Sequence, residues 1–248
     1  MILCIDSGNS RIKWGLHAGG VWRENGAIDH ADVAQLAVLP QRLPMPARAM
    51  LSNVAGEDAG KAIRQALAPW LAVLQEVEST DAAGGVINLY ENPARLGVDR
   101  WCALIGARAL TSAPCVVVMA GTATTVDTLA GDGRFLGGLI LPGLDLMRRA
   151  LARDTAALPL AAGSYSTHPR CTDDAIISGC IEAQAGAIER ACARLDRGAL
   201  CLLSGGAAST IGEYLKVPHR LIANLVLEGL LRLAVADPAV HAAGKNSG

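Results

Sequence analysis

Apolar and polar positions follow the same order twice along the chain. Residues 2–16 form an apolar run, a turn around Gly8 and then an alternating segment. This order is typical of a buried strand, a tight turn and a half-buried strand. Residues 115–129 repeat it around Gly121, with an apolar run before the glycine and alternation after it. The pattern therefore predicts two similar halves, with Gly121 in the place of Gly8.

Weaker patterns fill the rest of the chain. Further strands are expected near residues 21–23, 48–54, 135–141 and 200–203. Helices are expected over residues 57–70 (closed by Pro69), 97–110, 144–153, 172–195 and 224–236. The Gly- and Pro-containing segment 84–96 is expected to be a loop, and residues 243–248 are expected to fray. Strands that alternate with helices predict an α/β fold of two domains, residues 1–113 and 114–248, with one turn on each wall of a cleft.

Composition narrows the classes of partner. The chain has 248 residues, of which 51% are hydrophobic and only 3% aromatic, so its core is expected to consist of aliphatic side chains. A net charge of -1 gives no broad basic face, so neither a nucleic acid nor a membrane surface is an expected partner. No apolar run is long enough to span a bilayer, and no leader sequence is expected.

The cysteine and histidine patterns exclude two further classes of site. The seven cysteines contain no C-x-x-C pair and mostly lie in apolar runs, so we expect buried thiols in a reducing cytoplasm. The five histidines are scattered and predict no metal cluster.

The first candidate site is the turn at the start of the chain. A glycine lets the backbone approach a ligand closely, and neighbouring N–H groups can then face phosphate oxygens. Asp6 at the end of a buried strand is a candidate Mg²⁺ ligand, and Lys13 can neutralise phosphate charge. The alternative is an ordinary hairpin turn, because Asp, Gly, Asn and Ser form turns in any case.

The second turn offers neutral groups in the matching place. Thr122 can donate its hydroxyl and its N–H to a phosphate. The alternative is a β-rich segment in which threonine is simply favoured. Asp127, five residues on, is expected to have a structural or supporting role rather than a catalytic one.

Two helix starts carry the remaining candidates. Asp99 and Arg100 follow a Pro-containing loop; the carboxylate could accept a hydroxyl proton and the guanidinium could bind a carboxylate with two hydrogen bonds. Helix starts favour acidic residues anyway, so an exposed ion pair remains the alternative. Thr172 begins another helix and is expected to cap it.

Five segments in this order resemble one family, the type III pantothenate kinases of the acetate kinase/Hsp70/actin-like superfamily. They are Asp6-x-Gly8-Asn9-Ser10-x-x-Lys13, Asn92-Pro93-x-x-Leu96-Gly97-x-Asp99-Arg100, Gly121-Thr122-Ala123-x-Thr125-x-Asp127, Gly137-Gly138-x-Ile140-x-Pro142-Gly143 and Ser204-Gly205-Gly206. The resemblance implies an α/β fold of two ribonuclease H-like (actin-like ATPase) domains. It also implies a cytoplasmic homodimer that phosphorylates pantothenate with ATP and Mg²⁺ in the first step of coenzyme A synthesis.

The resemblance assigns roles to individual residues. Those expected to bind ATP are Asp6, Ser7, Gly8, Asn9, Ser10, Arg11, Ile12, Lys13 and Thr122. Those expected to bind pantothenate are Tyr90, Gly97, Val98, Asp99, Arg100 and, from the neighbouring subunit, Thr172. Asp99 is expected to be the catalytic base, and Asp6 a ligand of Mg²⁺.

One position departs from the family pattern. An aspartate that helps to bind K⁺ or NH₄⁺ usually precedes the second turn, and this chain has Met119 there. A thioether is a poor ligand for a hard monovalent cation, so weak or absent potassium dependence is expected. Two other functions remain open: an ATP-binding accessory factor for transcription without kinase activity, and a superfamily kinase for another small alcohol.

Overall fold

Two sheets with the same strand order form the framework. A computed structural model describes residues 1–195 and 199–236; the segment 243–248, expected to fray, lies outside these residues. The first sheet has the order β3-β2-β1-β4-β5, and the second contains β10-β9-β8-β11-β12, followed beyond β10 by β7 and β6. In both, the first three strands along the chain are antiparallel and the next two are parallel to the first. The predicted repetition is therefore confirmed.

The strands have the following bounds. Those of the first sheet are β1 (Ile2–Ser7), β2 (Arg11–Ala18), β3 (Val21–Asp29), β4 (Arg48–Asn53) and β5 (Leu74–Glu76). Those of the second sheet are β6 (Ala82–Ala83), β7 (Val86–Asn88), β8 (Cys115–Ala120), β9 (Ala123–Leu129), β10 (Arg134–Pro142), β11 (Leu200–Ser204) and β12 (His219–Leu221).

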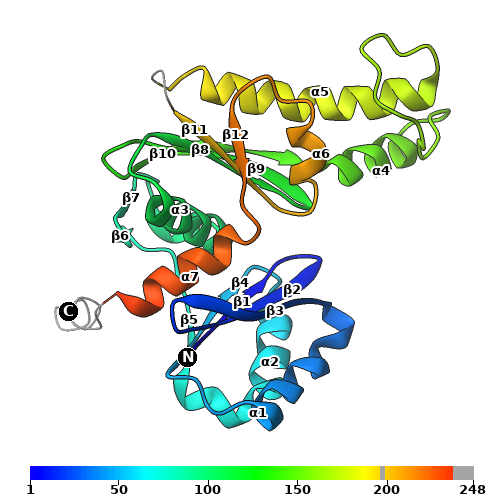
Figure 1. Ribbon diagram of the computed structural model, residues 1–248. Coiled ribbons are helices and arrows are strands. Elements are labelled where there is room, and N and C mark those ends of the chain that lie inside the picture. The colour runs from blue at the N-terminus through cyan, green and yellow to red at the C-terminus, as the bar shows by residue number, and fades with distance from the viewer. Residues whose placement is uncertain (196–198, 237–248) are drawn as a thin grey trace.

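Helices separate and cover the sheets in layers (Figure 1). Below the first sheet lie the 3₁₀ helices η1 (His30–Ala37) and η2 (Ala68–Val73) with α1 (Val38–Arg42) and α2 (Glu57–Ala66). Between the sheets lie α3 (Val98–Leu110) and α7 (Leu225–Val235). Above the second sheet lie α5 (Thr172–Cys192) and α6 (Ala208–Gly212), with α4 (Leu144–Asp154) beside α5. A short 3₁₀ helix, η3 (Pro93–Arg95), precedes α3.

The two central helices cross the expected boundary between the halves. α3 contacts β8 and β9 of the second sheet, whereas α7 packs on β1 and β4 of the first. Their backbones meet at glycine: a Cβ on Gly106 would lie 2.3 Å from the carbonyl oxygen of Leu225, and one on Gly229 would lie 1.8 Å from that of Cys102. β6 and β7 also join the second sheet from the first half of the chain. The division into 1–113 and 114–248 remains a prediction, with elements of each part reaching the other.

Several predicted bounds were wrong, for local reasons. The helix expected over 57–70 ends at Ala66, and Pro69 lies in the 3₁₀ helix that follows. The strand expected near 21–23 extends to Asp29. The prediction was too short because this edge strand has no fully buried residue, so its sequence shows little apolar pattern. The expected loop 84–96 contains β7 and η3. Residues 30–42 had no predicted structure and form η1 and α1.

Two predictions about side chains also need correction. Thr172 is the first helical residue of α5, and the residue that precedes the helix is Cys171, which makes no side-chain cap bond. Cys171 is exposed and Cys192 is half-buried, whereas the other five cysteines are buried as expected. All seven are free thiols.

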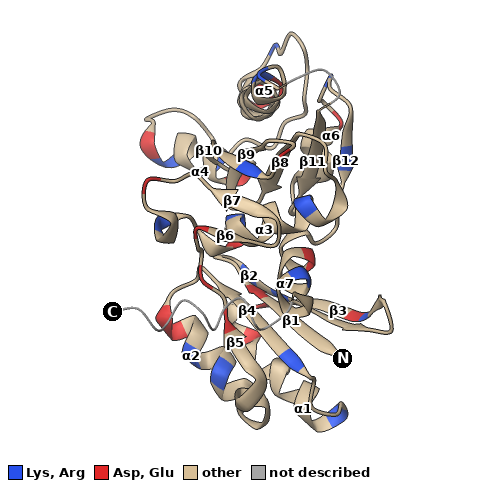
Figure 2. Cartoon of the chain, turned by 90° about the vertical axis from the view of Figure 1, so that its left-hand side faces the viewer, with Lys and Arg blue, Asp and Glu red and all other residues tan. Residues whose placement is uncertain are grey.

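Among the described residues no helix is both long and apolar enough to cross a bilayer. Figure 2 shows acidic and basic positions interspersed along the ribbon of both halves.

Candidate active site

The first glycine turn joins β1 to β2 and leaves backbone donors free. Gly8 N donates to the carbonyl oxygen of Arg11 at 3.1 Å, which closes the turn. On the flank, Val54 N donates to the carbonyl oxygen of Ser7 at 2.9 Å. The N–H groups of Asn9 and Ser10 have no partner among the described residues. Successive unpaired N–H groups in a turn are suited to bind an anion.

The second glycine turn joins β8 to β9 in the same way. Gly121 N donates to the carbonyl oxygen of Ala123 at 3.1 Å, and Thr122 N has no partner in the described part of the chain. Gly143, after β10, packs against this turn so closely that a Cβ would lie 2.2 Å from the carbonyl oxygen of Gly121. Gly143 therefore supports the second turn by close packing, while the Thr122 N–H has no partner among the described residues.

The two turns meet. The hydroxyl oxygens of Ser10 and Thr122 are 2.7 Å apart, although 112 residues separate them in the sequence. The sequence predicted that these turns face one ligand from opposite sides. Their contact brings three free N–H groups, those of Asn9, Ser10 and Thr122, into one region.

Asp6 lies behind the first turn with one oxygen unsatisfied. Asp6 is 8% exposed, and its Oδ1 has no hydrogen-bond partner among the described residues. The pKa of Asp6 is raised to about 7, mainly by burial and then by the nearby carboxylate of Asp99, and Lys13 partly offsets these two effects. A buried, unpaired carboxylate oxygen fits a cation such as Mg²⁺. No cluster of three or more His, Cys, Asp or Glu occurs within 1–195 or 199–236, so such an ion would take its other ligands from phosphate and water.

Asp99 lies in the first turn of α3, close enough to Asp6 to affect that residue's pKa. Its Oδ1 accepts a hydrogen bond from the backbone N of Arg100 at 2.8 Å. Two residues earlier, a Cβ on Gly97 would lie 2.7 Å from Oδ1 of Asp99, so a side chain there would displace this carboxylate. The helix start thus fixes the carboxylate while leaving Oδ2 available.

Arg100 is engaged within the protein. It is 4% exposed, and its Nε and Nη2 donate to the two carboxylate oxygens of Asp127. Its Nη1 donates to the Tyr90 hydroxyl at 2.8 Å. Burial would lower the pKa of Arg100, but the hydrogen bond and charge of Asp127 raise it above the usual range. The partner of the two-bond guanidinium contact is therefore Asp127, and this Asp127–Arg100–Tyr90 chain orients the tyrosine.

Thr172 lies in a separate cavity from the other candidates. This cavity of about 720 Å³ runs between α4 and α5 and is lined mostly by apolar side chains. None of Tyr90, Gly97, Val98, Asp99 or Arg100 lines it. Within one subunit the structure therefore does not bring Thr172 together with the predicted pantothenate residues.

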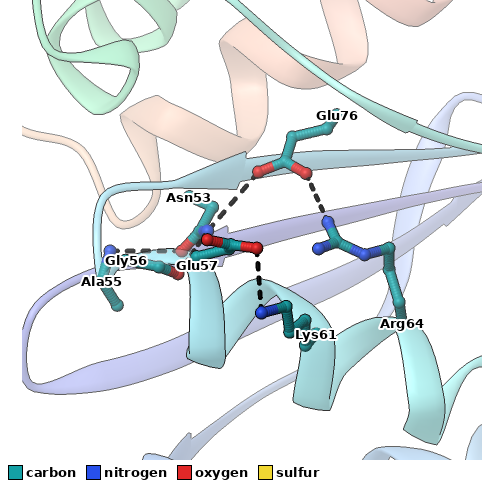
Figure 3. A network of polar contacts seen from close by, with 7 residues as sticks. All are labelled: Asn53, Ala55, Gly56, Glu57, Lys61, Arg64 and Glu76. Atoms are coloured by element: carbon teal, nitrogen blue, oxygen red, sulfur yellow. Dashed lines mark hydrogen bonds and ion pairs between the residues drawn. The ribbon is translucent and has the colours of Figure 1, made fainter.

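A second cavity, of about 440 Å³, lies behind the first turn. Asn9 and His30 line it together with residues of η1 and α2, including Ala55 and Asp58 just before and within α2. The turn that carries Ala55 is fixed by Asn53, whose side chain accepts from Ala55 N at 3.2 Å and donates to the carbonyl oxygen of Gly56 at 2.9 Å (Figure 3). Glu76 ties Asn53 to Arg64 of α2 in the same network. His30 and Asn53 were not predicted from the sequence, because a single polar residue at the end of a strand or just after it forms no motif.

Comparisons with known proteins agree with these features. The family model described as "Type III pantothenate kinase" matches residues 2–194. A protein of that name from Dechloromonas aromatica is 59% identical over 236 residues, which cover 95% of this chain and 99% of the relative.

Solved structures share the fold. One from Campylobacter jejuni, whose description proposes a Baf family transcriptional activator, has a TM-score of 0.65 at 19% identity and covers 96% of this chain and 99% of its own. One from Sinorhizobium meliloti, described as a proposed 2-dehydro-3-deoxygalactonokinase, has a TM-score of 0.55 at 15% identity and covers 94% and 98%. The expected α/β class with two actin-like ATPase domains is confirmed. By the family match and the identity to its relatives, the chain belongs to the type III pantothenate kinases and is a kinase.

Proposed function

We propose that this chain transfers the γ-phosphate of ATP to the primary hydroxyl of pantothenate beside the place where its two glycine turns meet. The product would be 4′-phosphopantothenate, the first intermediate of coenzyme A synthesis. The observation that carries this proposal is the 2.7 Å contact of Ser10 with Thr122, which gathers free N–H groups beside Asp6 and Asp99. Phosphoryl transfer depends mainly on positioning and on charge stabilisation, and this arrangement provides both.

The ATP phosphates would bind to the turns. The free N–H groups of Asn9, Ser10 and Thr122 donate to phosphate oxygens, and Lys13, opposite Asp6 on β2, neutralises their charge. Asp6 would hold Mg²⁺ directly or through water. Bound Mg²⁺ supplies neutralisation of the charge on the phosphates. Ser7, Gly8, Arg11 and Ile12 complete the binding segment through its backbone.

Asp99 would accept the proton of the substrate hydroxyl. The new bond joins the hydroxyl oxygen to the γ-phosphorus, the bond from that phosphorus to ADP breaks, and the proton moves to the Asp99 carboxylate. Gly97, Val98 and Tyr90 would contact pantothenate. Arg100 would support them through Tyr90, because Asp127 already occupies its guanidinium.

Monovalent cations would contribute little. Met119 takes the position that Asp6 has in the first half, and its side chain packs against the apolar core between the sheets. A thioether in that place offers no hard ligand to K⁺ or NH₄⁺. Equal turnover with potassium, with sodium or with no added monovalent ion would support this, and strong activation by potassium would refute it.

The active form would be a homodimer in the cytoplasm. Large apolar side chains are exposed on β10 and α4, among them Ile140 at 65%, Leu136 at 50% and Leu151 at 36%. No residue of α4 is fully buried, and the apolar cavity with Thr172 adjoins it. A partner subunit covering this surface would bury these side chains and bring Thr172 to the other subunit's pantothenate.

Mixed dimers test the shared site. A Thr172→Ala subunit and an Asp99→Asn subunit, each impaired alone, would regain activity when mixed, because one site of the hybrid would be intact. No recovery in a mixture shown to contain hybrids, or a monomer in solution, would overturn the shared site.

A direct assay tests the function itself. Purified protein with Mg-ATP and pantothenate is scored for ADP and 4′-phosphopantothenate, beside a panel of other small alcohols. Turnover with pantothenate far above that with the panel supports the proposal. Turnover of another alcohol instead would favour a different kinase, and ATP binding without turnover would favour the accessory-factor function.

A further inference from the structure

His30, the first residue of η1, contacts the first turn from behind. Its Nε2 lies 2.7 Å from the carbonyl oxygen of Gly8, 22 residues earlier in the chain. A carbonyl oxygen only accepts hydrogen bonds, so Nε2 must carry the hydrogen and donate it. The side chain is half-buried, which keeps this bond partly shielded from water.

This bond fixes the direction of the next N–H group. In a trans peptide the C=O and the following N–H point in opposite directions. Because the Gly8 carbonyl points toward His30, the N–H of Asn9 points to the other side of the turn. That N–H has no partner among the described residues. Ser10, the next residue, reaches across to Thr122 of the second turn.

Other contacts hold the rest of the turn, so His30 acts on the Gly8–Asn9 peptide in particular. Arg11 donates to the carbonyl oxygen of Ala27 at 3.2 Å and pairs with Asp29 at 3.2 Å, which attaches β2 to the end of β3. Neither contact acts on the Gly8–Asn9 peptide. His30 and Asn9 both line the 440 Å³ cavity, which would give this peptide room to rotate if the ring were removed.

We propose that His30 is a positioning residue that holds the Gly8 carbonyl away from ATP so that the Asn9 N–H faces its phosphates. This inference rests on the proposed function, because it takes the first turn as the ATP site. A histidine that only starts η1 would affect folding stability without a preference for one substrate.

Substitutions at His30 separate these roles. Leu removes the donor at similar volume, whereas Gln places an amide N–H₂ near the position of Nε2. His30→Leu should raise the KM for ATP, and the Kd of a non-hydrolysable ATP analogue, by about tenfold. The KM for pantothenate should change by less than about twofold, and His30→Gln should restore most ATP affinity. If the Leu variant does not fold, His30→Asn, a shorter amide with less reach, replaces it.

Two controls distinguish the possible failures. His17→Leu changes a histidine at the far end of the same hairpin, opposite Ile2, and should leave the KM for ATP unchanged. Lys13→Met removes the side-chain charge proposed to face the phosphates and so tests the ATP site independently of His30. A raised KM for ATP in Lys13→Met with a normal value in His30→Leu would overturn the role of His30 alone. Normal values in both would overturn the proposed ATP site, and equal loss for both substrates without rescue by Gln would show a purely structural role.

Discussion

The two halves build the same hairpin but place different chemistry beside it. In the first half Ser52, Asp6 and Lys13 lie side by side on β4, β1 and β2. In the second half the corresponding row on β11, β8 and β9 is Ser204, Met119 and Thr125. The serine is the same, whereas a charged pair is replaced by a thioether and a hydroxyl. Both halves carry a glycine turn with unpaired N–H groups among the described residues, and only the first places a carboxylate and an ammonium group beside that turn.

Two buried aspartates make the same contrast sharper. Asp6 keeps one oxygen without a partner in the part of the chain that the structure describes, and its pKa is about 7, raised mainly by burial. Asp127 in the second half has both oxygens bound by Arg100. A Cβ at Gly138 would lie 1.9 Å from Oδ1 of Asp127, so the sheet is shaped around this ion pair. An unpaired buried carboxylate suits a ligand, and a paired one supports the scaffold.

The largest expected effect is on catalysis, at the carboxylate next to Asp6. Asp99→Asn should lower kcat by about 10²–10⁴-fold, because the amide cannot accept the substrate proton. Binding of ATP, measured by calorimetry, should be kept. Asp132→Asn, an exposed aspartate in the β9–β10 turn, is the control and should turn over normally. Near-normal turnover of Asp99→Asn would remove the base role.

Breaking the paired carboxylate should cost stability. Asp127→Asn leaves Arg100 buried without a counter-charge, and the loss in free energy of unfolding should be about 3–5 kcal/mol. Urea unfolding measures it. The Asp132→Asn variant should unfold at nearly the wild-type urea concentration, since its ion pair is exposed. An equally small change in Asp127→Asn would mean that the buried pair is not a support.

The unpaired carboxylate should make stability depend on pH. The pKa of Asp6 is raised from 3.8 to about 7 by folding, so the native state binds more protons than the unfolded state between these values. The free energy of unfolding should therefore fall as the pH rises from about 4 through 7, by up to roughly 4 kcal/mol from this group. Asp6→Asn should remove that part of the decline and be more stable than wild type at pH 8 without Mg²⁺. Parallel pH profiles of the two proteins would contradict this.

The smallest expected effect concerns Met119, which lies between Ser204 and Thr125 in the second half. Met119→Asp would place a carboxylate between Ser204 and Thr125, whose hydroxyls have no hydrogen-bond partner among the described residues. Turnover of this variant should become a few-fold higher with potassium than with sodium, whereas Met119→Leu should respond like wild type. Equal turnover of Met119→Asp with potassium and with sodium would show that this side chain alone does not account for the difference between the two halves.

The local pattern of apolar and polar residues predicted the strands and turns, because each of these elements is formed by a few consecutive residues. The apolar runs before Gly8 and Gly121 and the alternation after them follow from burial of β1 and β8, so the repetition could be read directly. By contrast, η1 has one buried residue and β3 has none, and such segments give little apolar period to detect.

The site was predictable only in part. Asp6, Thr122 and Asp99 stand in short motifs whose chemistry is evident from residue type. Arg100 lies on α3 and its partner Asp127 is 27 residues away on β9, and His30 is 22 residues from the carbonyl that it binds. Pairings of this kind depend on the folded sheet, and no spacing in a single sequence specifies them.

The glycine contact between α3 and α7 has a consequence for recombining relatives of this protein. A chimera joined near residue 113 would take α3, with Asp99 at its start, from one parent and α7 from the other. The two helices touch through Gly106 and Gly229 with no room for a methyl group. A graft from a parent with a larger residue at either position would wedge them apart, so the two helices need to be inherited as a pair.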